Sequence, residues 1–176
     1  MLKTFTLKNG IKVATYSVMG MKSVFLSESV KGGSIFDTAK TSGTAHFMEH
    51  ILVEGTPSYP NVEILSNFIE GLAGRYSAYT YSQHIKFSLN APINHLEDVI
   101  KIASEVFFQP LFPIDSIERE RGAILEEVKG RQDAHWYKNS KFFSDIRFKK
   151  NHPLLLDGGG QIDTVNKVQR QDLISY

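Results

Sequence analysis

The chain has 176 residues, 41% of them hydrophobic and 22% charged, which is typical of one folded globular domain and excludes disordered and fibrous proteins. Its 20 basic and 19 acidic residues give a formal net charge of +1, so we expect neither nucleic acid nor a membrane as a partner. The sequence has no cysteine, which excludes disulfides and thiolate ligands and leaves His, Asp and Glu for any metal site.

The amino-terminal segment predicts three strands. Residues 2–7 and 11–16 alternate apolar and polar side chains and are separated by Lys8-Asn9-Gly10, and Asn-Gly is a strong hairpin signal. Residues 23–30 alternate in the same way. Neither the apolar stretch of a signal peptide nor a run of about eighteen apolar residues occurs in the chain. These features predict a cytoplasmic protein.

Two helices and a strand region follow. Residues 41–44 offer N-cap candidates for a helix over residues 45–52. Apolar residues recur at the spacing of one helical face over residues 61–72. Residues 76–90 are rich in Tyr, Thr, Ile and Phe and predict one long strand or a bent pair.

Helices dominate the remainder of the chain. Asn94 and Glu97 predict a capping box for a helix that ends near Pro110. Residues 136–176 predict helical pieces interrupted at 157–160, which includes three consecutive glycines. Because strands and helices do not alternate strictly, the order predicts an α+β fold, with an antiparallel or mixed sheet and helices packed on one face.

The predicted helix over residues 45–52 carries a pattern suited to a metal. His46 and His50 are four residues apart, so their imidazoles lie on one helical face and can bind one ion. Glu49 borders that face and is placed to act as a general base on a water at the ion. Zinc suits this set because catalytic zinc takes three protein ligands and keeps a fourth position for water.

A third ligand must come from elsewhere in the chain. A longer helix, capped by Asp115 or Ser116, carries four glutamates: Glu118, Glu120, Glu126 and Glu127. Glu120 and Glu127 are two turns apart on one side, whereas Glu126 points about 100° away from Glu127. Two carboxylates near the core would be explained by a cation, because an unpaired buried charge is costly. The alternative is a histidine pair on a helix with no metal.

The motifs extend beyond this pair of helices. His46-x-x-Glu49-His50 is the inverted zincin pattern, and the chain resembles the amino-terminal half of the insulinase, pitrilysin and mitochondrial processing peptidase family from Leu7 almost to its end. Four segments carry the resemblance: residues 7–13 resemble the family's opening hairpin, residues 43–50 its zinc helix, residues 54–57 the segment after it, and residues 118–128 its distal carboxylate helix.

The resemblance implies roles for individual residues. Glu127 becomes the third zinc ligand, Glu120 a carboxylate that orients a histidine ligand, and Glu126 a bystander. Residues Ser77, Ala78, Tyr79 and Thr80 resemble the family's Asn-Ala-x-Thr stretch, a strand edge that holds the substrate peptide. Ser77 departs from the pattern, because serine lacks the two-sided amide of asparagine, which affects substrate positioning or rate and not zinc binding. Ordinary strand packing is the alternative for Tyr79 and Thr80.

The resemblance also concerns size and partners. Family members pair two homologous halves, within one chain or across subunits, around the peptide. Residues 1–176 correspond to a single zinc-peptidase half-domain, and residues 164–173 resemble the helix before its last strand. We therefore expect the sequence to lack that strand, a helix and the second half. The expected partners are a peptide substrate and a homologous second half-domain or subunit, in a homodimer or heterodimer.

The hypothesis is a zinc-dependent endopeptidase in which Zn²⁺ on His46, His50 and Glu127 works with Glu49 as the base. One alternative is a non-catalytic, peptide-binding or scaffold subunit of the same family. Such a subunit would be expected to have lost motif residues, and all four are present. A plain interaction domain with a fortuitous histidine pair is the other alternative.

Overall fold

The computed structural model describes all residues from Met1 to Tyr176. The strands are β1 (Leu2–Thr6), β2 (Lys12–Tyr16), β3 (Ser23–Lys31), β4 (Arg75–Thr80) and β5 (His84–Pro92). The helices are α1 (Thr44–Ile51), α2 (Val62–Gly71), α3 (Leu96–Phe108), α4 (Ile114–Asp133), α5 (His135–Arg147), α6 (Ile162–Val165) and α7 (Arg170–Ser175).

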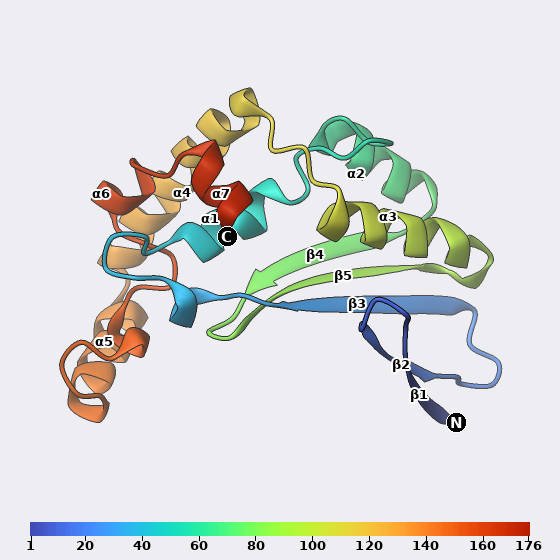
Figure 1. The fold of residues 1–176 in the computed structure, drawn as a ribbon, viewed down its shortest axis with the longest axis horizontal. Coiled ribbons are helices and arrows are strands. Elements are labelled where there is room, and N and C mark those ends of the chain that lie inside the picture. The colour runs from blue at the N-terminus through green and yellow to red at the C-terminus, as the bar shows by residue number, and fades with distance from the viewer.

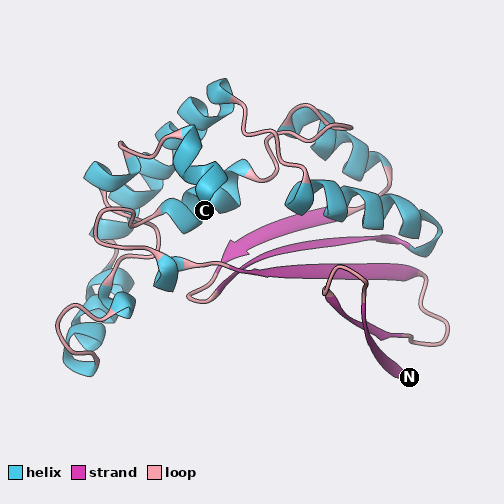
Figure 2. Cartoon of the chain, viewed as in Figure 1, coloured by secondary structure: helices cyan, strands magenta, loops and turns pink.

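The central feature is an antiparallel sheet with the strand order β3-β5-β4. Alternate side chains of β5 are buried, namely Ile85, Phe87, Leu89 and Ala91. Helices α1, α2 and α3 pack on the face that these side chains cover, whereas α5 lies beyond the end of the sheet (Figures 1 and 2). The predicted α+β fold with helices on one face is confirmed, and residues 76–90 form the bent pair.

The first two strands form a separate sheet. β1 and β2 pair with each other in antiparallel register and with no other strand. Gly10 adopts a φ of 88°, and the Asn9 side chain accepts a hydrogen bond from the Ile11 N–H at 3.3 Å. The Asn-Gly pair thus forms the hairpin as predicted, and the hairpin lies apart from the helical layer (Figure 1).

Buried apolar side chains hold α1 against α4. Phe47 and Ile51 of α1 are fully buried, as are Ile124 and Val128 of α4. Burying each side chain of this size contributes roughly 1.5–3 kcal/mol. Because these residues occupy the shared inner faces, His46, which precedes Phe47, lies at the edge of the α1–α4 contact and is only partly buried.

The N-cap of α1 falls within the predicted residues 41–44, whereas the predicted caps of α3 and α4 are wrong. Gly43 is the N-cap of α1 and makes no side-chain capping bond; instead, Asp37 accepts the Gly43 N–H at 2.9 Å. α3 begins at Leu96 after a 3₁₀ turn over Ile93–His95, so Asn94 does not cap it. α4 begins at Ile114. The proposed caps Asp115 and Ser116 therefore lie inside its first turn.

None of the helices combines the length and the apolar content that crossing a membrane requires.

Candidate metal centre

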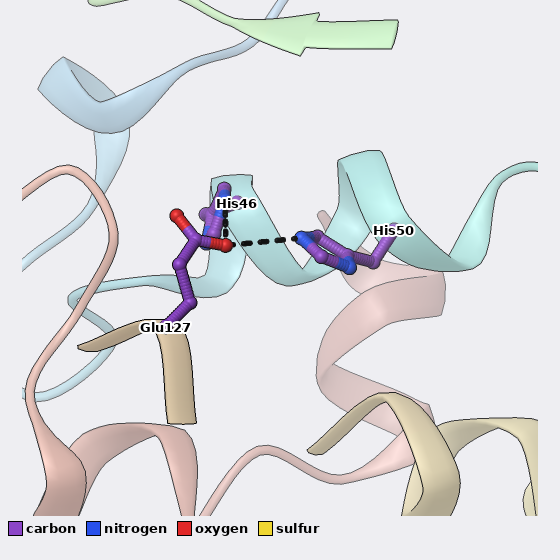
Figure 3. Close-up of side chains that lie close together, drawn as sticks. All are labelled: His46, His50 and Glu127. Atoms are coloured by element: carbon purple, nitrogen blue, oxygen red, sulfur yellow. Dashed lines mark ion pairs between the residues drawn. The ribbon is translucent and has the colours of Figure 1, made fainter. Parts of the chain in front are cut away.

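Two histidines project from α1 toward α4 (Figure 3). The rings of His46 and His50 have centroids 4.7 Å apart and are nearly perpendicular. Their backbones are fixed because the next residues along the helix, Phe47 and Ile51, lie about 100° further round it and are buried in the core. Both imidazoles keep some solvent contact, with 12% and 24% of the side chain exposed.

Glu127 of α4 meets both rings (Figure 3). Its Oε2 lies 3.6 Å from Nε2 of His46 and 3.8 Å from Nε2 of His50. Tetrahedral zinc with ligand bonds of about 2.0–2.1 Å separates its ligand atoms by about 3.4 Å. The three side chains thus have the chemistry and the spacing of a zinc site, since all ligand atoms lie within 4.8 Å of one another.

The surroundings keep His46 in the form that binds a metal. Burial lowers the pKa of His46, and the neighbouring His50 lowers it further, whereas Glu127 and Glu49 raise it. The net direction is downward, which favours the neutral imidazole. A neutral ring offers a lone pair to a cation, which a protonated ring cannot do.

Glu120 contacts the far side of the second imidazole. Its Oε2 lies 3.0 Å from Nδ1 of His50. A partner on Nδ1 fixes the tautomer and turns Nε2 toward the site. Glu120 in turn lies 3.5 Å from Nε of Arg119, which pairs with the buried Glu54. Glu54 and Arg119 stand in segments that carry the resemblance, but the sequence predicted no role for either; the available signal was a carboxylate directly after the apolar residues 51–53.

Of the other glutamates, Glu49 lies near the histidines and Glu126 does not. Glu49 lies on α1, is partly exposed, and is close enough for its charge to raise the pKa of His46. Glu126 is exposed and pairs with Lys129 at 2.7 Å. Glu126 is therefore not part of the cluster.

The predicted substrate strand lies beside α1. Residues Ser77 to Thr80 belong to β4, an edge strand that pairs only with β5. The Thr80 hydroxyl donates to the carbonyl of Ala45 at 3.3 Å, directly before His46. Ala78 packs on the core, whereas Tyr79 is more than half exposed. The unpaired edge of β4 thus ends next to the histidine helix.

Sequence reasoning also missed Arg131. This side chain follows Glu127 by one helical turn and lies 4.0 Å from Oε1 of Glu127. The available signal was the Glu-to-Arg spacing of four residues, which favours an ion pair on a helix.

A family model described as Insulinase (Peptidase family M16) matches residues 12–151. The chain belongs to the insulinase family of peptidases. The resemblance found in the motifs is thereby confirmed, and this insulinase-family chain is a member of a zinc metallopeptidase family. The matched segment includes both histidines and Glu127.

Relatives of this insulinase-family chain include proteins named as proteases. It is 32% identical over 184 residues to the mitochondrial-processing peptidase subunit beta of Dictyostelium discoideum, covering 99% of the chain and 37% of the relative. It is 25% identical over 134 residues to the uncharacterized zinc protease YmxG of Bacillus subtilis, covering 76% of the chain and 32% of the relative. The chain thus spans about a third of each relative.

Solved structures share the fold. The periplasmic protease PqqL of Escherichia coli matches with a TM-score of 0.88 and 27% identity, covering 99% of this insulinase-family chain and 20% of that protein. A structure described as a peptidase M16 inactive domain from Pseudomonas fluorescens matches with a TM-score of 0.90 and 21% identity, covering 99% and 42%. Since the relatives' names include mitochondrial and periplasmic proteins, the cytoplasmic location stays a prediction.

Proposed function

We propose that this chain is the zinc-binding, catalytic part of a metalloendopeptidase. The observation that carries the proposal is the convergence of His46, His50 and Glu127 within ligand distance of one ion, with Glu49 on the same helix. Three relatives are named zinc proteases, which supports zinc as the metal. The donor set of two imidazoles and one carboxylate is the one that catalytic zinc uses in several peptidases.

His46, His50 and Glu127 would hold the ion, and Glu120 would orient His50. Zinc supplies a Lewis acid that lowers the pKa of water to about 7 and polarises a carbonyl. Glu49 accepts the proton of the attacking water and returns it to the leaving amine. Glu49 suits this role because it is partly exposed on α1, where it can reach both solvent and a bound peptide.

The free edge of β4 supports a role in holding the substrate. An edge strand presents unpaired N–H and C=O groups, to which an extended peptide can add as a further strand. Residues Ser77 to Thr80 would align the peptide, and Thr80 ties this edge to α1 through Ala45. Ser77 cannot make the two-sided contact of an asparagine amide. Another group must therefore make that contact to the peptide.

A homologous second half-domain or subunit would complete the binding chamber. The chain spans 37% of its Dictyostelium relative, which is named as a subunit, and only 20% of the PqqL chain. The alternative function is a non-catalytic, peptide-binding subunit. This alternative is supported by a structural neighbour that is described as an inactive domain.

The test combines zinc content with cleavage of a peptide library, with and without a homologous second-half protein. We expect about one zinc per chain at neutral pH. We also expect cleavage when the second-half protein is present, whether or not the chain cleaves alone. Glu49→Gln should keep the zinc and abolish cleavage, whereas Glu126→Gln, the exposed control, should match the wild type. Absence of zinc, or full activity in Glu49→Gln, would overturn the proposal. Stoichiometric zinc without cleavage in any mixture would favour the non-catalytic alternative.

A further inference from the structure

The guanidinium of Arg131 lies directly on the backbone of Gly159. A Cβ atom built on Gly159 would overlap Nη1, Nη2 and Cζ of Arg131. The φ of Gly159 is not in the left-handed region, so backbone conformation does not require glycine here. The close approach of the guanidinium requires glycine at this position, because any larger residue would overlap it. This explains why the middle residue of the run 158–160 is glycine.

Asp157 closes the other side of this contact. Its Oδ1 lies 3.4 Å from Nη2 of Arg131 and accepts the Gly159 N–H at 3.0 Å. Its Oδ2 accepts the Tyr137 hydroxyl at 2.7 Å, and its carbonyl accepts the Ser42 hydroxyl at 2.9 Å. Only 16% of the Arg131 side chain and 11% of Asp157 are exposed. Asp157 and Gly159 thus form a cradle around the guanidinium, in which Nε and Nη2 of Arg131 are buried and make no hydrogen bond.

The cradle places Arg131 beside one oxygen of Glu127. Nη1 lies 4.0 Å from Oε1, whereas Oε2 is the oxygen that faces His46 and His50. Glu127 is 48% exposed, so burial does not hold its side chain in place. Arg131 is the one Lys or Arg that pairs with Glu127 in the structure.

We propose that Arg131 is a positioning residue whose charge attracts one oxygen of Glu127 across 4.0 Å and so leaves the other facing the metal, and that Asp157 and Gly159 form the cradle around it. This proposal rests on the proposed zinc site. A cation so near a metal would normally oppose binding by repulsion. Asp157 offsets that repulsion, because its carboxylate lies against the same guanidinium.

Two different substitutions should disturb this arrangement. Arg131→Gln removes the cation, and Gly159→Ala keeps it but displaces it, since the new Cβ takes the space of the guanidinium. Gly130→Ala is the matched control, because it adjoins Arg131 on α4 and its Cβ would meet no atom within 4 Å. Removing a group that orients a metal ligand typically costs about 10–100-fold in affinity.

The experiment measures the zinc affinity of the full chain by chelator competition, together with the visible spectrum of the Co²⁺-substituted protein. We expect each of Arg131→Gln and Gly159→Ala to weaken zinc binding at least about tenfold and to change the Co²⁺ bands. The double variant should bind no more weakly than Arg131→Gln alone, because both act through one contact. Gly130→Ala should match the wild type.

Two results would overturn this proposal: wild-type zinc affinity in both single variants, or losses of zinc affinity that add fully in the double variant. Neither result would contradict the proposed zinc site itself. A wild-type chain without zinc would overturn the proposed function and this proposal together. If Arg131→Gln melts below the working temperature, Gly159→Ala decides, since it retains the arginine and its charge.

Discussion

At the scale of single residues, Glu120 is the neighbour of the cluster with the most direct contact to a histidine, at 3.0 Å from Nδ1 of His50. Glu120→Gln keeps an acceptor but loses the charge that favours the oriented imidazole. We expect zinc affinity to fall by about 10–100-fold, as measured by chelator competition. Glu126→Gln should have no effect, because Glu126 pairs with Lys129. Equal affinities for the two variants would contradict this role.

Asp37 should make stability depend on pH. Burial raises the pKa of Asp37 from 3.8 to about 6, although the N–H groups of Gly43 and Ala45 lower it. The folded chain therefore holds this proton more tightly than the unfolded chain, and stability falls as pH rises through this range. The loss is roughly 2–3 kcal/mol for a shift of this size.

Asp37→Asn tests this dependence, since the amide oxygen can still accept the Gly43 N–H. Urea unfolding of the metal-free chain from about pH 4 to about pH 6 gives the free energy of unfolding against pH for the wild type and for Asp37→Asn. The contributions of the other titrating groups cancel in the difference between the two curves. We expect the wild type to lose stability relative to Asp37→Asn as pH rises. Parallel curves would show that Asp37 does not titrate in this way.

Sequence spacing predicted part of the cluster and left part open. The four-residue spacing places His46 and His50 on one side of a helix, because helical periodicity is local. Spacing alone did not separate Glu120 from Glu127, since both lie on one side of α4. Their different contacts depend on how α4 packs on α1. The contact of Arg131 with Gly159 depends on a distant loop, which no local pattern encodes.

At the scale of elements, the start of α1 depends on Gly43. Its φ is 94°, and an added Cβ would lie 2.6 Å from Cα of Gly160. Gly43→Ala should therefore destabilise the fold by roughly 2 kcal/mol or more, since a left-handed conformation and a steric overlap both oppose it. Thermal or urea unfolding measures the change.

Gly122→Ala is the control for that substitution. Gly122 lies within α4, and its Cβ would meet no atom within 4 Å. Alanine is the better helix former by roughly 0.5–1 kcal/mol, so this variant should be more stable than the wild type. A Gly43→Ala protein as stable as Gly122→Ala would refute the strained start of α1.

The elements were predictable where local chemistry decides them. Asn61 caps α2, and its side chain accepts the Ile64 N–H at 2.9 Å, in agreement with the helix predicted from residue 61 onward. The start of α1 was predictable to within residues 41–44, but its capping contact was not, because the N-cap is Gly43 and Asp37 accepts the Gly43 N–H through a folded-back loop. Tertiary contacts replaced local capping there.

At the scale of the whole molecule, a bound metal would join α1 to α4. A ligand that binds only the folded chain stabilises it, by about 2.7 kcal/mol when present at 100 times its Kd. We therefore expect Zn²⁺ to raise the melting temperature and a chelator to reverse the rise. His46→Ala should show no rise. A wild-type melting temperature that is indifferent to zinc would contradict an ion bridging the helices.

The layer arrangement followed from the order and periodicity of the elements, because alternating strands with one apolar face must be covered by helices. The separation of β1 and β2 into their own sheet was not predictable. Alternation identifies a strand, but it does not specify which distant strand becomes its neighbour.

The two helices of the cluster also differ in when they are made. A ribosome completes His46 and His50 well before it reaches Glu127, so a nascent chain carries two imidazoles and no third ligand. Even then the carboxylate arrives only when α4 docks on α1. The proposed site would be complete only after α4 has docked on α1, so a nascent chain that stops before residue 127 would compete poorly for zinc in the cell.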